Sequence, residues 1–198
     1  MKFKALSLPD LEQVRQWRNE CLEALRTPFL LTKEMQEEFY KDIICNRHAN
    51  ARYWGVWVDE KVTMSMVKPM PDVEVDGEIF IGMTGLENIS WENRLAEISI
   101  MLNPGYHRKG YGKKAVELLL DQGFNYLNLE NIYGECYACN PALIFWFKII
   151  EKYNADIVLL PNRKYYNGQY FSGTYFNINK GAFLKHENPV LEPTQTPN

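Results

Sequence analysis

The sequence contains no apolar run long enough to cross a bilayer. Its best candidate, residues 136–147, falls well short of the ~20 residues that a spanning helix requires. The N-terminus starts basic, as a signal peptide does, but Pro9, Asp10 and Glu12 interrupt the apolar stretch before a hydrophobic region can form. We therefore expect a cytoplasmic protein that has no membrane partner.

An excess of positive charge is also missing. The chain has 22 Lys and Arg residues against 25 Asp and Glu residues, which gives a formal net charge of −3. A nucleic-acid-binding domain presents a basic surface, so we expect no nucleic-acid partner. The balance still allows a local basic groove for a ligand that carries phosphate.

Cysteine is scarce, with only four residues, and in a cytoplasmic protein these are expected to be thiols. Cys136 and Cys139 have the C-x-x-C spacing of redox and metal sites. In a strand, residues three apart point to opposite faces, and Cys21 and Cys45 form no second pair. The three histidines show no spacing that suggests a triad or a metal cage, so we expect no metal.

What the chain does have is an ordinary globular composition, with 46% hydrophobic and 24% charged residues. Its 10 Phe, 5 Trp and 12 Tyr residues are enough to fill one core in a chain of 198 residues. We expect a single domain over residues 1–179. The hydrophobic periodicity ends at this point and three prolines follow, so residues 180–198 are expected to form a flexible tail.

Hydrophobic periodicity predicts a mixed α+β architecture. Helices are expected to start near Leu11, after an N-cap at Thr32, near Tyr111 and at Pro141. The last of these is expected to run to Lys152 and to be largely buried. Turns or loops are expected at residues 59–61, 68–77, 87–93 and 162–170. Strands are expected at residues 3–8, 52–58, 62–67, 78–86, 95–102, 131–138, 156–160 and 171–178.

The most informative stretch is the phosphate loop, residues 103–112, which joins a predicted strand to a predicted helix. Gly110 and Gly112 allow a ligand to approach the backbone, and the first N–H groups of the helix form an anion site at its positive end. Basic side chains surround the site, and they are Arg108, Lys109, Lys113 and Lys114. The spacing fits neither a Walker A nor a Rossmann motif. A Gly-rich turn before a solvated basic helix is the alternative interpretation.

Residues 96–112 resemble motif A of the GNAT acetyltransferases, which has the form Arg/Gln-x-x-Gly-x-Gly/Ala. Residues 132–141 resemble the next strand of that family and the Asn that starts its following helix. The resemblance covers roughly residues 78–178, with a looser match at residues 17–19. The subgroups it points to acetylate ribosomal-protein N-termini, spermidine or amino sugars.

The resemblance implies a GNAT-like, mostly antiparallel mixed sheet with helices on both faces. It implies acetyl transfer from acetyl-CoA to a primary amine of a small molecule, an amino sugar or a peptide N-terminus, and it is compatible with a homodimer. Strands 95–102 and 131–138 would splay and leave a slot for the pantetheine, beside Asn140. The residues it implies for CoA binding are Met101, Leu102, His107, Arg108, Lys109, Gly110, Tyr111, Gly112, Lys113 and Asn140.

The sequence departs from the family at two positions. His107 replaces the first Arg or Gln of motif A. Phe147 replaces the Tyr that the family often places seven residues after the Asn, as the acid for the departing thiolate. Tyr133, Tyr137 and Tyr165 are candidate substitutes for this acid. Phe147 also motivates a second interpretation, an acyl-CoA-binding module that has lost catalysis.

Attack on a thioester requires a neutral amine, and hence a base or a water relay. Glu97 is the leading candidate, because alternation puts it with Ser99 and Met101 on the strand face opposite the apolar residues. A solvated or salt-bridged strand Glu is the alternative interpretation. Glu87, Glu92 and Glu135 are weaker candidates for the base.

Overall fold

The computed structural model describes residues 1–26, 29–64 and 73–187, and its centre is a seven-stranded sheet. The strands follow the spatial order β1-β2-β3-β4-β5-β7-β6. All neighbours are antiparallel except β4 and β5, which are parallel. The strands are β1 (Lys2–Lys4), β2 (Arg52–Met64), β3 (Val73–Ser90), β4 (Leu95–Leu102), β5 (Asn131–Tyr137), β6 (Asp156–Tyr166) and β7 (Gln169–Asn179).

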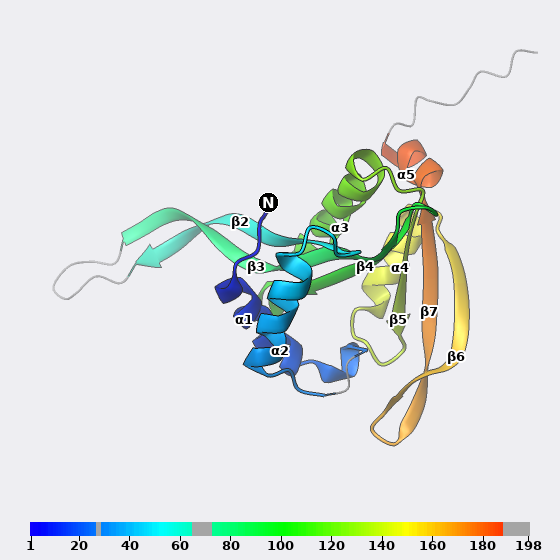
Figure 1. Cartoon of the computed structure of the whole chain (residues 1–198), viewed down its shortest axis with the longest axis horizontal. Helices are drawn as coiled ribbons and strands as arrows, with labels where there is room; N and C mark the ends of the chain where they lie inside the picture. The colour runs from blue at the N-terminus through cyan, green and yellow to red at the C-terminus, as the bar shows by residue number, and fades with distance from the viewer. Residues whose placement is uncertain (27–28, 65–72, 188–198) are drawn as a thin grey trace, which may run out of the picture.

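Helices cover both faces of the sheet (Figure 1). On one face, apolar side chains such as Val116, Trp146 and Phe183 meet Ile132 of β5 in the largest core cluster. On the other, Leu11 and neighbouring apolar residues pack against β3. The first group of helices is α3 (Tyr111–Asp121), α4 (Leu143–Lys152) and α5 (Lys180–Glu187), and the second is α1 (Leu8–Asn19) and α2 (Lys33–Phe39). This architecture confirms the predicted α+β fold class.

Alternation along β4 works as the sequence predicts. Ala96 and Ile98 are buried in the core cluster beneath α3 and α4. Met101 packs on the opposite face, in the cluster with α1. Glu97 shares that second face, so a buried carboxylate, 7% exposed, lies in the sheet beneath the first two helices.

The first helix begins earlier than predicted. Ser7 accepts from the Asp10 N–H and the Asp10 carboxylate accepts from the Ser7 N–H, which forms a capping box. The helix therefore starts at Leu8, and the predicted strand over residues 3–8 ends at Lys4. Thr32 caps α2 as predicted, through the Met35 N–H.

The tight turn predicted at residues 59–61 is wrong. Strand β2 runs through these residues to Met64 and pairs with β3 from Val73 onward, in a long hairpin that projects from the body in Figure 1. The acidic side chains of this hairpin, Asp59 in β2 and Glu78 in β3, are both paired with Lys2 of β1, at 3.3 and 3.1 Å. Residues 73–77 of the expected loop are strand, while residues 65–72 lie outside the described residues. The turn predicted at 87–93 starts later, after Ser90.

The end of the chain differs most from expectation. The joining segment predicted at 162–170 is mostly strand, and the β6–β7 turn is made by Asn167 and Gly168, whose φ angles are positive. Helix α5 occupies part of the expected tail, because Phe183 is buried against the core. Residues 188–198 lie outside the described residues. Helix α4 is also less buried than predicted, since Ile144 is 70% exposed.

Candidate active site

Strands β4 and β5 part within the sheet, as predicted. They pair over three positions, the last of which joins Glu97 to Tyr133, and beyond it each continues without the other. Gly134 follows directly in β5. A Cβ at this glycine would lie 2.5 Å from Phe176 and 2.8 Å from Ile98, so its missing side chain lets these two residues close the apex of the V-shaped gap.

The phosphate loop leaves β4 at the open end of this gap. Asn103 accepts from the Gly105 N–H at 2.9 Å, and the chain then turns through Arg108 and Gly110, with φ angles of 60° and 84°. Gly110 is the N-cap of α3 and has no side chain that could accept from the first-turn N–H groups. These donors, at the positive end of a helix, are the predicted anion site.

Gly112 supports a ligand site independently of charge. It lies in the first turn of α3, where glycine is unfavourable for a helix by about 1 kcal/mol relative to Ala. A Cβ there would make only ordinary contacts, at 3.5 Å to Phe145, so packing does not require glycine. Gly110, at the N-cap, is the glycine whose missing side chain leaves open space, because a Cβ there would meet nothing within 4 Å.

The side chains of the phosphate loop brace it rather than all facing a ligand. The Nε2 atom of His107 lies 3.0 Å from the carbonyl oxygen of Leu102, so the ring N–H donates back to the end of β4. Lys109 places its Nζ over the ring of Tyr106, at 4.7 Å from the centroid. His107 therefore has a local partner at the position where the family has Arg or Gln.

A carboxylate from the base of the long hairpin fastens both ends of the loop. Glu60 in β2 accepts from the hydroxyl of Tyr106 at 3.2 Å and from that of Tyr111 at 2.8 Å. Burial first, and then the charge of Glu60, raises the pKa of the Tyr106 hydroxyl. Both tyrosines therefore stay protonated donors, which hold the start of α3 against β2. Sequence reasoning missed Glu60, because 46 residues separate it from Tyr106.

Glu97 is tightly held at the apex of the gap. Its Oε2 accepts from Nη1 of Arg26 at 2.9 Å and from Nδ2 of Asn88 at 3.0 Å, while Nη2 of Arg26 donates to Oε1. Across the strand pair, Glu97 lies opposite Glu87. Two like charges in register repel each other, so the Arg26 guanidinium is the counter-charge that this site needs.

Glu97, Glu87 and Glu135 form what we call the carboxylate cluster, and Arg26 connects two of them. Its Nη2 lies 3.6 Å from Glu135, and Arg163 donates to Glu135 from Nε at 2.8 Å. The Glu97 and Glu135 side chains are only 9% and 5% exposed. The fourth candidate base, Glu92, is instead exposed in the turn before β4.

Tyrosine rings surround the cluster. Tyr133 and Tyr175 stack with centroids 5.5 Å apart, and burial, followed by the charge of Glu97, raises the pKa of both hydroxyls. Tyr53 is hydrogen-bonded to Glu87, and burial together with that carboxylate raises its pKa strongly. Gly85 makes room for this ring, because a Cβ there would lie 2.3 Å from Tyr53. A site of carboxylates and aromatic rings is suited to cations.

Sequence reasoning missed the strap that supplies Arg26, the short helix Leu22–Ala24 and its flanks. Lys164 donates to three of its carbonyl oxygens, those of Leu22 at 3.1 Å, Glu23 at 2.8 Å and Leu25. Asn140 donates to Ala24 at 3.2 Å and accepts from the Ala142 N–H at 2.8 Å. The Asn140 amide thus links the strap to the turn before α4, which begins at Leu143 instead of the predicted Pro141.

The candidates for a proton donor to the thiolate are dispersed. Phe147 lies on α4 with 41% exposure, and Tyr165 is 60% exposed beside the β6–β7 turn, where it packs against Tyr170. Tyr137 is buried beneath Arg26, to which it is hydrogen-bonded, and burial raises its pKa. Tyr133, at the apex, is the candidate that the fold places beside Glu97.

The cysteines do not form a reactive pair. All four are free thiols. Burial raises the pKa of Cys136 to about 12, and the Cys139 thiol points to the Glu23 carbonyl oxygen at 3.3 Å. Within the described ranges, no group of three or more His, Cys, Asp and Glu side chains is placed to hold a metal ion. Among the same residues, no helix combines the length and apolar character of a membrane span.

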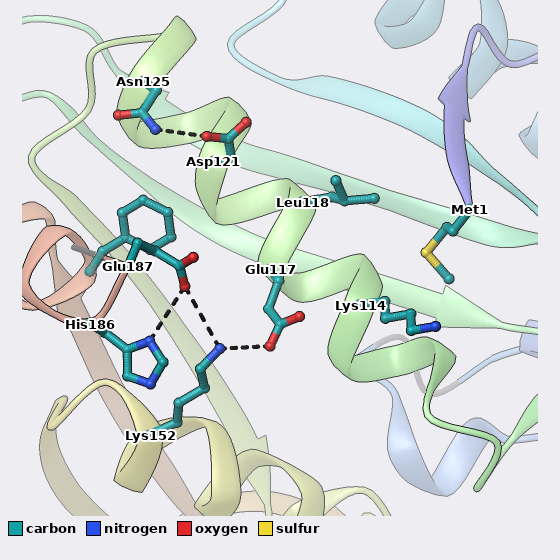
Figure 2. Close-up of a pocket in the computed structure, with 10 residues that line it drawn as sticks. Met1, Lys114, Glu117, Leu118, Asp121, Asn125, Lys152, His186 and Glu187 are labelled. Atoms are coloured by element: carbon teal, nitrogen blue, oxygen red, sulfur yellow. Dashed lines mark hydrogen bonds and ion pairs between the residues drawn. The ribbon is translucent and has the colours of Figure 1, made fainter. Parts of the chain in front are cut away.

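A groove of about 610 Å³ lies along α3 (Figure 2). Lys152 of α4 reaches into it and contacts Glu117 at 2.6 Å and Glu187 of α5 at 3.8 Å. These charges neutralise one another at the junction of three helices. Apart from Lys114, the residues that line this groove belong to neither the phosphate loop nor the carboxylate cluster.

A family model described as an acetyltransferase (GNAT) domain matches residues 1–152. The chain belongs to the GNAT acetyltransferase family. Acetyl-CoA is the co-substrate of this family, and the parted strands and the open helix start of α3 fit it.

Two relatives are similar in sequence to about two thirds or less of the chain. Spermidine N(1)-acetyltransferase of Escherichia coli (strain K12) is 31% identical over 126 residues, which are 62% of this chain and 66% of that protein. The chain thus spans just under two thirds of this curated relative. An uncharacterized N-acetyltransferase, p20, of Bacillus licheniformis is 27% identical over 128 residues, 56% of this chain and 71% of that protein.

Solved structures bear out the fold. Spermidine N-acetyltransferase from Vibrio cholerae, in complex with CoA and spermine, superposes with a TM-score of 0.72. The likeness covers 92% of this chain and 97% of that one at 21% identity. At this identity the comparison shows a common fold, including the mixed sheet that the GNAT resemblance implies.

Proposed function

We propose that this chain transfers the acetyl group of acetyl-CoA to a primary amine of a small polycation of the polyamine class. The observation that carries the proposal is the carboxylate cluster with its tyrosines, at the apex where β4 and β5 part. Carboxylates buried among aromatic rings favour a ligand with several positive charges. The spermidine acetyltransferase among the relatives supports the same class.

The phosphate loop supplies the donor half of the reaction. The N–H groups from Arg108 to Lys113 would hold the pyrophosphate, with Gly110 and Gly112 leaving the backbone accessible. The last residues of β4, Met101 and Leu102, would border the pantetheine in the gap between the strands. When bound, acetyl-CoA supplies an activated thioester carbonyl, and the chain supplies its position and orientation.

The carboxylate cluster supplies the acceptor half. We assign to Glu97 the removal of a proton from the substrate ammonium, directly or through water, which leaves the nitrogen lone pair free to attack. The new C–N bond forms as the C–S bond breaks, sulfur leaves with the bonding electrons as a thiolate, and the second proton of the nitrogen passes to the thiolate or to water to give the neutral amide. A thiol pKa of about 8.5 makes this leaving group acceptable without a dedicated acid.

Phe147 supports one competing function, an acyl-CoA-binding module without turnover. Its ring has no proton to donate at the position where the family often places a Tyr. We favour the enzyme, since Glu97 and the phosphate loop are both present. The two functions differ in a single observable, the release of CoA in the presence of an amine.

A panel of amines tests the proposal. The purified chain is mixed with acetyl-CoA and with spermidine, spermine, glucosamine, an aminoglycoside or a peptide with a free N-terminus, and free thiol is followed over time. We expect CoA release with the polyamines, and a heat-denatured sample gives the background. Release only with the sugars or the peptide would overturn the polyamine class. CoA binding without release for any amine would favour the binding module.

A further inference from the structure

We infer that the acceptor binds by exchanging with the side chain of Arg26, and that an acceptor with more than one ammonium group exchanges more readily because Arg26 faces two carboxylates. The inference rests on the proposed function and adds a residue that determines its specificity. It concerns the side chain of Arg26 and its two partners in the carboxylate cluster, Glu97 and Glu135.

The first argument is the geometry of the guanidinium. It donates twice to Glu97 and also lies 3.6 Å from Glu135, so one cation neutralises two carboxylates. The carboxylates are nearly inaccessible, whereas the Arg26 side chain is 48% exposed. Arg26 therefore covers the carboxylates from the solvent side, where an acceptor must enter.

The second argument is that Arg26 can leave without loss of the strap. The backbone before it is held by Lys164 and Asn140, through the carbonyl oxygens of residues 22–25. The chain after it is held where Leu31 exchanges hydrogen bonds with Asn19, at 2.8 and 3.0 Å. The hydrogen bonds of the Arg26 side chain go to other elements, so exchanging it breaks none of these anchors.

The third argument is charge balance. A buried carboxylate that loses its counter-charge is strongly destabilised, so whatever replaces Arg26 must neutralise Glu97 and also restore the second cation beside Glu135, which otherwise keeps Arg163 alone. A diamine or longer polyamine can place one ammonium group at each carboxylate. A monoamine can replace Arg26 at only one of them, so either Glu97 stays unpaired or Glu135 is left with Arg163 alone. The exchange also frees the oxygens of Glu97 from the Arg26 guanidinium, so that they can contact the substrate ammonium.

Three variants and two ligands test the inference. Arg26→Gln removes the competing charge, Arg26→Lys keeps it, and Arg163→Gln is the matched control, since Arg163 pairs with Glu135 but not with Glu97. Calorimetry measures the binding of spermidine and of propylamine to each protein. Circular dichroism verifies that each variant is folded, and steady-state kinetics with spermidine follow.

We expect Arg26→Gln to bind spermidine about tenfold more tightly and to lower its KM by a similar factor, with a smaller change in kcat. Arg26→Lys should stay near the wild type, and the gain for propylamine should be smaller. Equal or weaker spermidine binding by folded Arg26→Gln, with CoA release intact in the wild type, overturns the inference alone. An equal gain in Arg163→Gln or for propylamine also overturns it. Absence of CoA release from the wild type, with spermidine still binding more tightly to Arg26→Gln, counts against the proposed function and supports the exchange.

Discussion

The phosphate loop and the carboxylate cluster are built in opposite ways. The loop is one continuous segment whose binding groups are backbone N–H donors, and most of its charged side chains are exposed. The cluster takes its residues from separate strands and a strap, and its charges are buried and mutually neutralised. The loop is therefore sensitive to the shape of the backbone, and the cluster to the identity of each side chain.

The contrast predicts the largest effect for a substitution that blocks the backbone site. Gly112→Asp places a carboxylate where the pyrophosphate must approach, so steric hindrance and anion repulsion together should abolish CoA binding. Calorimetry with CoA measures the loss. Unchanged CoA affinity in a folded Gly112→Asp protein would defeat the assignment of the phosphate loop.

Gly112→Ala separates folding from binding in the same experiment. The added Cβ makes only ordinary contacts with Phe145, and Ala favours the helix by about 1 kcal/mol. Because motif A accepts Gly or Ala at this position, we expect a higher unfolding midpoint with CoA affinity almost unchanged. Loss of CoA binding in folded Gly112→Ala, as complete as in Gly112→Asp, would show that the effect of Asp is steric and does not depend on its charge.

In the carboxylate cluster we expect the opposite result, a loss of turnover without a loss of CoA affinity. Glu97→Gln keeps the shape of the side chain but removes its basicity, so kcat at neutral pH should fall by about 10²–10⁴-fold while CoA affinity is almost unchanged. Part of the loss should return as the pH rises, because more of the amine is then already neutral. Glu92→Gln, in the exposed turn, is the control. Wild-type activity of Glu97→Gln across the pH range would place the base elsewhere.

The smallest effect is expected at the proton donor. Phe147→Tyr restores a hydroxyl on a half-exposed position of α4, but the thiolate can leave unprotonated. The rate of CoA release should therefore be similar to that of the wild type or modestly higher. Should the wild type be inactive with every amine and Phe147→Tyr be active, the acid would be indispensable and the proposed enzyme would be wrong.

The same contrast explains what the sequence could predict. The strand over residues 95–102 and the helix start at Tyr111 match the structure, because alternation, Gly110 and Gly112 are local signals. The parting of β4 and β5 was foreseen only through the family resemblance. The side-chain partners of the phosphate loop escaped prediction, since Glu60 comes from a strand far away in sequence.

The cluster could be predicted only in part. Alternation predicted the face of the strand on which Glu97 lies but not its burial, and its partner Arg26 is 71 positions away with no local pattern that joins them. A hairpin was predicted here, but its turn was placed too early, at residues 59–61, because their charges are typical of a turn and the partner of Asp59, Lys2, comes from another strand. Helix α5 was missed because a single buried residue, Phe183, gives it too weak a periodic signal.

Gly134 gives the gap between β4 and β5 a fixed depth. Phe176 and Ile98 occupy the place of the missing side chain, so the gap between the two strands is closed one residue beyond Tyr133. If the pantetheine enters the gap from the phosphate loop, as we propose, its acyl end should stop there, at the level of Glu97. A longer acyl group would have to turn aside at Gly134 instead of going deeper, so we expect the gap to limit the length of the acyl group.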